Sequence, residues 1–353
     1  MNIEKLAQTL SDGEGYLVFS EENRRYFTGF AATDGWLVVS RSASVLLMDS
    51  RYVEAARSAV GCCEVALLKK SYEQISGICA ELGITRLYIE TDRLNVSEYL
   101  RLKERLNGIE IDSSEKAVRE ISLLRRIKTE EEISLICKAQ DIAEKAFTHI
   151  LSFIREGVTE RDISLELDYF MLRSGAEALS FETIAVSGPN SSRPHGVPGS
   201  RKIQYGDFIT MDYGAVCDGY HSDMTRTVAV GRADEKMVSV YGTVLSAQKA
   251  SLDIIAPGMS CTECDKAARD IITAAGYGEC FGHGTGHGVG IEIHESPSLS
   301  PRAEGNLMVG DVVTVEPGIY LPGEFGVRIE DMALVTENGV RNLTKCPKEL
   351  IIV

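Results

Sequence analysis

A segment rich in glycine and histidine, residues 281–295 (FGHGTGHGVGIEIHE), constrains this chain more than any other feature. It holds three of the six histidines in the sequence, His283, His287 and His294. Glycines stand between them, and glycine lets a backbone adopt left-handed dihedrals and lets other groups approach closely. A single histidine is most often a satisfied core or surface residue, but three within such a loop predict a site that positions imidazoles.

Two aspartates are candidate partners for these imidazoles. Side chains alternate between the two faces of a strand, so in the predicted strand 208–216 the carboxylate of Asp212 shares a face with Thr210. Asp223 opens a second predicted strand, 223–230, eleven residues after Asp212. We expect a hairpin to bring the two carboxylates together.

Two glutamates follow in strand-like segments further along the chain. Glu316 ends the predicted strand 311–316, and Glu330 shares a face with Arg328 in the predicted strand 327–335. One acid at the end of a strand is usually a solvated charge. Four acids in apolar, β-rich segments are harder to explain in that way, so we expect them to converge.

Converging carboxylates favour bound metal ions. Without a counter-charge, mutual repulsion and desolvation would force protons onto them. Two divalent ions would balance about four negative charges and would hold a bridging hydroxide as the nucleophile. Mostly oxygen ligands with one imidazole, which we expect to be His287, suit Mn, Fe, Co or Zn better than Ca or Mg. Manganese is the ion that we expect first.

Five residues in a particular order and spacing carry a family resemblance: Asp212, Asp223, His287, Glu316 and Glu330. Together with the motifs HGTGHGVGIEIHE and VEPGIY, they resemble the metallopeptidase family that contains Xaa-Pro dipeptidase (prolidase), aminopeptidase P and methionine aminopeptidase. The resemblance implies an α+β "pita-bread" catalytic domain with two metal ions at residues 125–353. It also implies a creatinase-like α/β domain at residues 1–124, which simple methionine aminopeptidases lack.

The resemblance implies a role for each of the five residues. Asp212 and Asp223 would bind one metal ion, and Asp223 would bridge to the second. His287 and Glu316 would complete the second site, and Glu330 would bridge both ions. Glu316 would also act as the general base and proton shuttle.

Further residues match the substrate side of that family. His195 ends an N-x-x-x-P-H motif that begins at Asn190. His283 and His294 match two other histidines, and His294 would donate a hydrogen bond to the developing oxyanion. The catalytic set that the resemblance implies is His195, His283, His294, Glu316, Tyr320 and Arg328.

The activity implied by the resemblance is hydrolysis of Xaa-Pro bonds in a small peptide, as in Xaa-Pro dipeptidase. One alternative is aminopeptidase P, which acts on longer Xaa-Pro-Yaa peptides. Others are a metal-stabilised binding paralogue without catalysis and a creatinase-like, metal-free amidinohydrolase, although the complete ligand set argues against both. The prolyl members of the family also imply a homodimer.

A second metal pattern competes for one of these histidines. Cys261, Cys264, Cys280 and His283 have a spacing found in structural zinc sites. However, Cys261 and Cys264 begin a predicted helix, 262–275, with apolar residues on its inner face, and His283 already has a role. We therefore favour a core position for these cysteines.

Composition limits the partners and the compartment. A formal net charge of -15 and a pI near 5.0 argue against nucleic acid or an anionic membrane as a partner. The first fifteen residues lack the apolar core of a signal peptide, and no apolar run approaches the length of a membrane span. Nine irregularly spaced cysteines indicate reduced thiols. We therefore expect a cytoplasmic protein.

The remaining segments alternate between strand and helix patterns. In the first 124 residues we predict strands at 16–19, 36–40, 45–48, 64–68 and 86–89, and helices at 52–59, 72–82 and 97–106. A basic patch at 124–128 precedes a capping box of Thr129 and Glu132, which predicts a long helix to about residue 154. Two more helices are predicted at 160–173 and 234–255. The domain boundary should lie just before the long helix.

Overall fold

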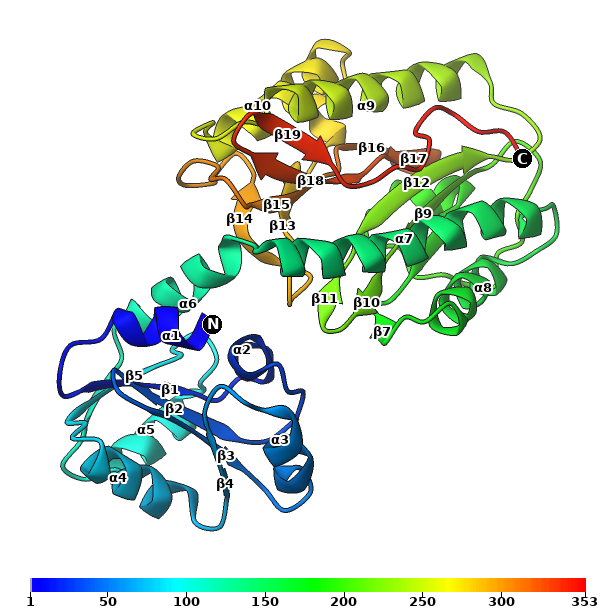
Figure 1. Ribbon diagram of the computed structural model, residues 1–353. Coiled ribbons are helices and arrows are strands. Elements are labelled where there is room, and N and C mark those ends of the chain that lie inside the picture. The colour runs from blue at the N-terminus through cyan, green and yellow to red at the C-terminus, as the bar shows by residue number, and fades with distance from the viewer. Residues whose placement is uncertain (1) are drawn as a thin grey trace. The chain divides into compact units, whose positions relative to one another are not determined.

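The computed structural model describes residues 2–353, and the chain divides into two compact units, Met1–Arg125 and Arg126–Val353. Figure 1 shows the elements of each unit. The expected boundary, between residues 124 and 125, lies one position from this division. Among the helices of residues 2–353, none is long and apolar enough to cross a lipid bilayer.

The N-terminal unit is an α/β unit around one mixed sheet with the strand order β4-β3-β2-β1-β5-β6. Its strands are β1 (Glu14–Val18), β2 (Trp36–Ser40), β3 (Ser44–Met48), β4 (Glu64–Leu67), β5 (Arg86–Ile89) and β6 (Glu110–Asp112). Its helices are α1 (Asn2–Gln8), α2 (Glu21–Thr28), α3 (Val53–Ala59), α4 (Ser71–Glu81), α5 (Val96–Arg105) and α6 (Lys116–Arg126). The predicted α/β class of this unit is confirmed.

Four elements of this unit were not expected from the sequence: α1, α2, β6 and α6. The pattern of α2, EENRRYFT, is too polar to signal a buried helix. The structure nevertheless buries Arg24, whose guanidinium donates hydrogen bonds to the carbonyl oxygens of Phe19 and Ala32. Tertiary contacts of a buried arginine therefore stabilise a helix that local hydrophobicity does not predict.

The basic run 124–128 is not an exposed patch. Arg125 and Lys128 are buried, and Arg125 donates to Asn23 within the N-terminal unit. In the C-terminal unit, the guanidinium of Arg126 binds the carboxylate of Asp311 at 2.6 Å. Because each of these charges has an internal partner, the run serves the fold and offers no basic binding surface.

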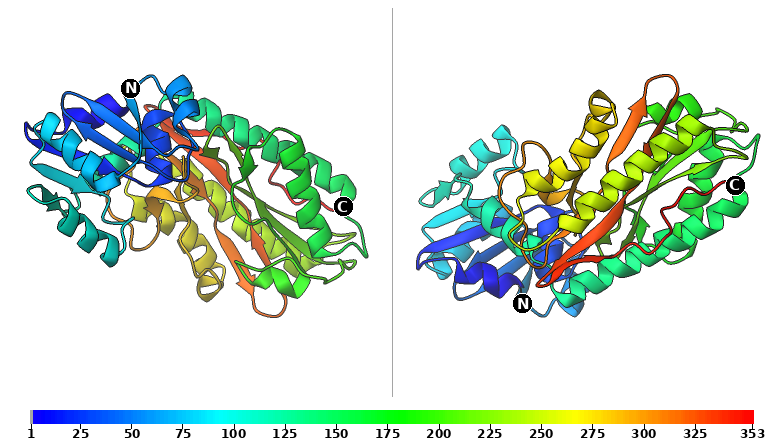
Figure 2. Two further views of the ribbon diagram at one scale, coloured as in Figure 1. Left: turned by 90° about the horizontal axis from the view of Figure 1, so that it is seen from below. Right: turned by 90° about the horizontal axis from the view of Figure 1, so that it is seen from above.

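Four α-helices frame the C-terminal unit: α7 (Glu130–Phe153), α8 (Glu160–Arg173), α9 (Glu235–Ile254) and α10 (Cys261–Ala274). The predicted capping box is confirmed, because Thr129 Oγ1 accepts from the Glu132 amide and the Glu132 carboxylate accepts from the Thr129 amide. In Figures 1 and 2, α7 and α9 lie on either side of the strands. Helix α7 packs on β10 and β11, and α9 packs on β15, β16 and β17.

The strands of this unit form four small sheets, with the orders β12-β9-β8, β14-β13-β15-β18-β19, β11-β10-β7 and β16-β17. The first half contributes β7 (Ala178–Leu179), β8 (Ile184–Ser187), β9 (Phe208–Tyr213), β10 (Ala215–Cys217), β11 (Tyr220–His221) and β12 (Met224–Ala229). The second half contributes β13 (Gly286–Gly288), β14 (Glu295–Leu299), β15 (Val312–Val315), β16 (Gly318–Leu321), β17 (Phe325–Arg328), β18 (Asp331–Thr336) and β19 (Gly339–Asn342). The described residues also hold two short 3₁₀ helices, Gly188–Ser192 and Gly278–Cys280.

Two predicted strands were wrong in extent, because each is two strands. Segment 208–216 breaks at Gly214, where any Cβ would collide with the carbonyl oxygen of Ser222, and the chain passes there from the β9 sheet to the β10 sheet. Segment 327–335 breaks at Ile329 and Glu330, because β17 pairs with β16 while β18 pairs with β15. A bend is required wherever one segment serves two sheets.

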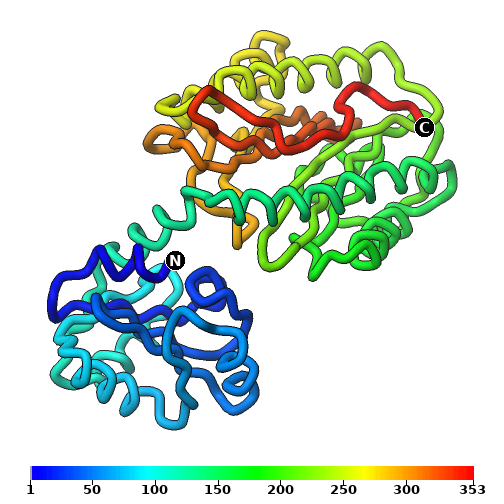
Figure 3. Tube along the Cα trace, in the orientation of Figure 1, coloured from blue at the N-terminus to red at the C-terminus, as the bar shows by residue number. Residues whose placement is uncertain are grey.

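The end of the chain packs against the strand that follows Asp223. Ile352 forms a parallel bridge with Ala229 of β12, and the Val353 amide donates to the Ala229 carbonyl at 2.9 Å. Figure 3 shows the C-terminus beside this segment. The last residues therefore cover an edge of the sheet that carries part of the candidate site.

Candidate metal centre

The two aspartates reach the site from neighbouring strands. Strands β9 and β12 pair antiparallel, with Asp212 opposite Thr225, so the predicted pairing is confirmed. Asp223 directly precedes β12, and the β10–β11 hairpin is inserted between the two strands. The opposite face of β9 packs into a core: Ile209, Met211 and Tyr213 are fully buried there with residues of α7 and α8. That burial orients Asp212 away from the core.

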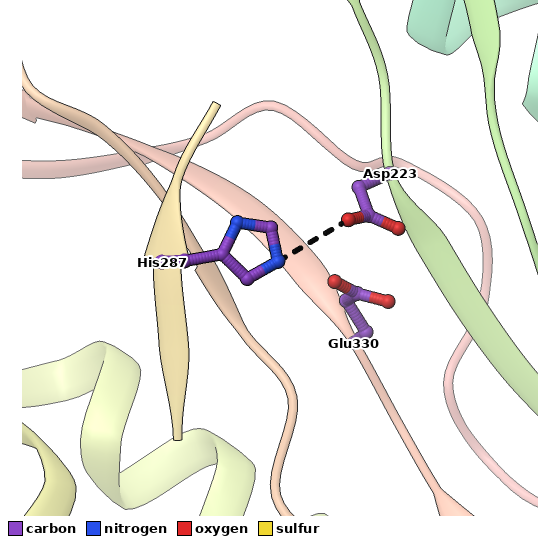
Figure 4. A group of neighbouring side chains, drawn as sticks. All are labelled: Asp223, His287 and Glu330. Carbon is purple, nitrogen blue, oxygen red and sulfur yellow. Dashed lines mark ion pairs between the residues drawn. The ribbon is translucent and has the colours of Figure 1, made fainter. Parts of the chain in front are cut away.

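Three side chains converge most closely. Asp223, His287 and Glu330 each offer a ligand atom within 4.8 Å of the others, the one such group of metal-binding type within residues 2–353. Figure 4 shows them approaching from three separate segments. His287 Nε2 lies 3.5 Å from Asp223 Oδ2 and 3.4 Å from Glu316 Oε1. Glu316 and Asp212 lie outside this group of three but line the same cavity.

Three of the four site carboxylates have one oxygen that accepts a hydrogen bond from a protein donor. Asp212 Oδ2 accepts from Arg328 Nη2 at 2.5 Å, and Glu330 Oε2 accepts from the Thr225 hydroxyl at 2.7 Å. Glu316 Oε1 accepts from the Thr314 hydroxyl at 3.3 Å.

Three other carboxylate oxygens are buried and have no hydrogen-bond partner among residues 2–353: Asp212 Oδ1, Asp223 Oδ1 and Glu330 Oε1. A buried polar atom without a partner is rare and costs roughly 1–3 kcal/mol, more when it is charged. Oxygens of this kind on Asp223 and Glu330, which are grouped with the imidazole of His287, match the donor set of a divalent metal ion. The residues present therefore fit such an ion.

Burial controls the protonation of these groups in the metal-free protein. Desolvation, followed by repulsion from neighbouring acids, raises the pKa of Asp223 and of Glu330 well above the usual range. Desolvation also raises the pKa of Glu316 to about 8. The site therefore holds protons near neutral pH that a bound cation would displace.

The imidazole of His287 is prepared as a ligand. Desolvation lowers the pKa of His287 to about 4, so its ring is neutral at pH 7. Its Nδ1 lies 3.1 Å from the Gly288 carbonyl oxygen, which can only accept a hydrogen bond. The proton is therefore on Nδ1, and the lone pair of Nε2 faces the carboxylates.

The other two histidines of the loop flank His287 in the sequence. His283 Nδ1 donates to the Gly284 carbonyl, and its Nε2 is 2.9 Å from the Tyr320 hydroxyl, which also accepts from Arg328. Desolvation lowers the pKa of His283 to about 4, so this Nε2 accepts from Tyr320. The His294 ring is exposed, with its centroid 4.3 Å from that of His287.

A cavity of about 600 Å³ opens over these residues. The predicted site residues that line it are His195, Asp212, Asp223, His283, His287, His294, Glu316 and Arg328. Glu330 and Tyr320 are buried and are not among the lining residues. The sequence did not identify the apolar part of the lining, which includes Phe181, Val197 and Ile293. Single apolar residues in loops carry no periodic signal that could have revealed them.

The loop that bears His195 is fixed by a buried carboxylate that the sequence did not single out. Glu160, at the start of α8, accepts from the Ser187 amide, the Asn190 side chain and the Gly199 amide. These donors lie on both sides of His195 in the chain. The exposed imidazole is therefore carried by a loop anchored at both ends.

Glycine is needed at several positions of the histidine loop for a steric reason, and the closest approach is at Gly286. A Cβ at Gly286 would collide with the carbonyl oxygen of Thr314. At Gly282 nothing lies within 4 Å of such an atom. Gly286 thus lets β13 approach β15, which brings His287 close to Glu316.

The cysteine pattern does not form a metal site. Cys261 and Cys264 are fully buried in an apolar core with Leu252 and Leu299. Cys280 packs against a different core. The two α10 cysteines therefore act as small core residues.

Two family models match the chain. One, described as metallopeptidase family M24, matches residues 134–337, and the other, described as a Creatinase/Prolidase N-terminal domain, matches residues 3–125. The chain is 38% identical to a Xaa-Pro dipeptidase of Pyrococcus furiosus, over 99% of each chain.

Solved structures resemble the whole chain. A Xaa-Pro dipeptidase from Bacillus anthracis is 43% identical with a TM-score of 0.95, covering 100% of this chain and 99% of that one. An X-Pro aminopeptidase from Thermotoga maritima MSB8 is 34% identical with a TM-score of 0.91, covering 99% of this chain and 100% of that one.

Proposed function

This chain belongs to metallopeptidase family M24, with a creatinase-type α/β domain before a pita-bread catalytic domain, and on that basis we propose that it is an exopeptidase that hydrolyses Xaa-Pro bonds. The observation that carries the proposal is the set of three buried carboxylate oxygens without a partner among residues 2–353, on Asp212, Asp223 and Glu330, two of which acids are grouped with His287. That set opens into a cavity with further imidazoles at its wall. We further propose that the domains comprise residues 1–124 and 125–353.

Five residues are proposed to hold two divalent metal ions: Asp212, Asp223, His287, Glu316 and Glu330. Asp212 and Asp223 would bind one ion, His287 and Glu316 the other, and Asp223 and Glu330 would bridge. When bound, the ions would supply a hydroxide nucleophile at neutral pH and would polarise the scissile carbonyl. The ligand chemistry favours manganese, with cobalt, zinc or iron as alternatives.

The protein's own groups have distinct proposed tasks. Glu316 is the proposed general base and shuttle of the proton to the leaving amine, since its carboxylate lines the cavity next to His287. His294 is the proposed donor to the oxyanion, a contact typically worth about 3 kcal/mol. His195 and His283 would hold the far side of the peptide.

Tyr320 and Arg328 are proposed to support these groups. The Tyr320 hydroxyl fixes the ring of His283, and the guanidinium of Arg328 holds both that hydroxyl and Asp212. The same cation thus connects a substrate-side histidine with a metal-side acid. This connection supports assigning both residues to the catalytic machinery.

The proline preference rests on relatives. The Pyrococcus furiosus relative and the Bacillus anthracis structure are both named Xaa-Pro dipeptidases. The second candidate, cleavage of longer Xaa-Pro-Yaa peptides, is favoured by the similarity to the Thermotoga maritima X-Pro aminopeptidase. We propose the dipeptidase activity first because its named relatives include the more similar sequences.

A peptide panel tests the proposal. Xaa-Pro, Xaa-Pro-Yaa and Met-Yaa peptides are incubated with the full chain after loading with Mn, Co, Fe or Zn, and products are separated by chromatography. We expect cleavage of Xaa-Pro that a chelator abolishes. Faster cleavage of Xaa-Pro-Yaa would favour the second candidate. No cleavage of any prolyl peptide by protein that carries two metal ions would refute both and favour a non-catalytic binding protein.

Assembly and location are also proposals. A homodimer is expected from the prolyl members of the family, and sedimentation of the purified chain tests it. We also propose a cytoplasmic location, which cell fractionation tests.

A further inference from the structure

A buried carboxylate directly follows the exposed histidine of the site. The side chain of Glu295 is only 5% exposed, whereas the preceding residue, His294, is exposed and lines the cavity. Glu295 is not among the residues that line the cavity, so its carboxylate is not part of the wall against which a substrate would lie. Any effect of this carboxylate on the site is therefore exerted through its neighbours.

The Glu295 carboxylate closes the turn that carries His294. Its Oε1 accepts from the Glu292 amide, three positions earlier, at 3.0 Å, and its Oε2 accepts from Lys128 Nζ at 2.9 Å. Lys128 lies just before α7, and its side chain is 1% exposed. The Lys128 amide in turn donates to the Gly310 carbonyl at 3.1 Å. The turn is thus tied to a fixed point at the start of the long helix.

The backbone of the histidine loop leaves room for this carboxylate. A Cβ at Gly290 would collide with the carboxylate of Glu295. The Gly290 amide donates to the Glu292 carbonyl at 3.0 Å, and the Gly290 carbonyl accepts from the His221 amide at 2.8 Å. The segment that leads to His294 therefore lies close around the carboxylate and is held at both of its sides.

We propose that Glu295 is a positioning residue that holds His294 in place for donation to the oxyanion. The His294 ring is exposed, and its centroid lies 4.3 Å from that of His287. An exposed ring has few contacts of its own, so its place depends on the backbone that carries it. A displacement of about 1 Å at a catalytic group costs about 100-fold in rate. The inference rests on the proposed function in taking His294 as the oxyanion donor.

Paired substitutions remove the carboxylate without leaving a charge buried. Loss of one partner of a buried ion pair is strongly destabilising, whereas replacement of both by apolar residues of similar volume is often neutral. Lys128→Met with Glu295→Met, the methionine pair, removes the oxygen to which the Glu292 amide donates. Lys128→Met with Glu295→Gln, the glutamine pair, also removes both charges but keeps that oxygen.

A second ion pair of the same unit supplies a matched control. The carboxylate of Asp311 accepts from the Met308 amide, three positions earlier, at 2.7 Å and binds the Arg126 guanidinium at 2.6 Å. The Asp311 side chain has no exposed surface. This carboxylate also closes a turn and pairs with a cation, but its turn carries none of the proposed site residues. Arg126→Met with Asp311→Leu is therefore the control pair.

Turnover is measured with the manganese-loaded full chain on the best prolyl substrate of the peptide panel, and urea unfolding checks that each variant is folded. An oxyanion contact forms only in the transition state, so its loss lowers kcat and leaves KM unchanged. We expect the methionine pair to lower kcat by about 10- to 100-fold. The glutamine pair should stay within about threefold of the unchanged protein, well below that range. Equal kcat values for the two pairs would overturn the inference.

Substitution of His294 separates positioning from a general structural role. His294→Ala alone should lower kcat by about 100- to 1,000-fold. If Glu295 acts through this imidazole, adding the methionine pair to His294→Ala should change kcat by less than about threefold, because effects on one functional unit are not additive. Any loss caused by the control pair should persist in the same background. An undiminished loss from the methionine pair in the His294→Ala background would overturn the inference.

A measurement without metal or substrate tests the position of the ring itself. Nuclear magnetic resonance of the full chain with isotope-labelled histidine records the ring signals, and His294→Ala identifies the signal of that ring. We expect the methionine pair to displace the His294 signal and the control pair to leave it in place. An unmoved signal in the methionine pair would overturn the inference. If the unchanged protein cleaves no prolyl peptide, the proposed function fails, and this signal alone decides the inference.

A crystal structure of the unchanged, manganese-loaded chain with a phosphinic analogue of a prolyl peptide covers the case in which the methionine pair does not fold. We expect a phosphinate oxygen within hydrogen-bond distance of the His294 imidazole. We also expect the Glu295 carboxylate to remain on the Glu292 amide. His294 bound to the phosphinate while Glu295 is turned away from that amide would contradict the inference.

Discussion

The metal-free protein should become less stable as the pH rises from 6.5 to 8. The pKa of Glu316 is raised to about 8 in the folded state, against an ordinary value of 4.5, and the pKa values of Asp223 and Glu330 are raised as well. Between the ordinary and the raised pKa of each carboxyl group, the folded chain binds more protons than the unfolded chain. The free energy of unfolding therefore decreases as the pH rises.

The histidines set the lower limit of this pH range. The pKa values of His283 and His287 are lowered from 6.5 to about 4. The folded chain binds fewer protons there, so these groups make stability rise with pH up to 6.5 and add nothing above it. Below 6.5 the two effects oppose each other, whereas above 6.5 the carboxylates are the groups of the site that change stability.

The magnitude is set by the width of this window. From pH 6.5 to the Glu316 pKa of about 8 is 1.5 units, and one unit corresponds to about 1.4 kcal/mol. Titration of Glu316 alone should therefore lower the free energy of unfolding by about 2 kcal/mol between pH 6.5 and 8. Asp223 and Glu330 act in the same direction. That is a large share of the 5–15 kcal/mol typical of folded proteins. Bound cations replace the protons, so loading with manganese should remove the slope.

Urea unfolding at pH 6.5, 7, 7.5 and 8, with chelator or with manganese, measures the effect. Circular dichroism follows both units, and the fluorescence of Trp36, the one tryptophan in the sequence, follows the N-terminal unit. Glu316→Gln should flatten the slope, whereas Glu337→Gln, at an exposed position, should not. A chelated protein whose unfolding free energy is constant or rises over this window would refute the reasoning.

Three further outcomes are expected. Asp212→Ala should abolish both bound metal and hydrolysis, because it removes a ligand and leaves the buried guanidinium of Arg328 without its carboxylate. Metal analysis and a peptide assay measure these two losses. Normal turnover by the metal-free variant would contradict the prediction. Gly286→Ala should destabilise the fold by more than about 3 kcal/mol, because its Cβ collides with Thr314, while Gly282→Ala should be tolerated; equal melting temperatures for the two variants would show the steric argument to be wrong. Manganese titration at pH 7 should release protons, which calorimetry in buffers of different ionisation enthalpy detects. Identical heats in all buffers would show that manganese does not displace protons from the site.

Local patterns in the sequence predicted those parts of the site that depend on local geometry. The period of two in β9 assigned Asp212 and the core residues to opposite faces, and the capping box located the start of α7. The same period would have revealed Thr225 and Thr314, each two positions from an acid. These threonines were missed because a hydroxyl in a strand is usually unremarkable.

Other features depend on tertiary contacts and carry no local signal. The breaks at Gly214 and at Glu330 arise because one segment pairs in two different sheets, which a hydrophobic pattern cannot show. The role of Glu160 requires donors from a loop that follows it by 27 to 39 positions. A helix-starting glutamate is ordinarily solvated, so its burial could not be inferred.

The spread of the acids along the chain has a consequence for how the protein matures. The candidate ligands extend from Asp212 to Glu330, 118 positions apart, and they converge only through pairing of distant strands. Contacts between distant segments require closure of long loops and form slowly. A nascent chain therefore acquires its complete ligand set only after synthesis has passed Glu330, and ion capture during refolding reports that the catalytic unit has already assembled.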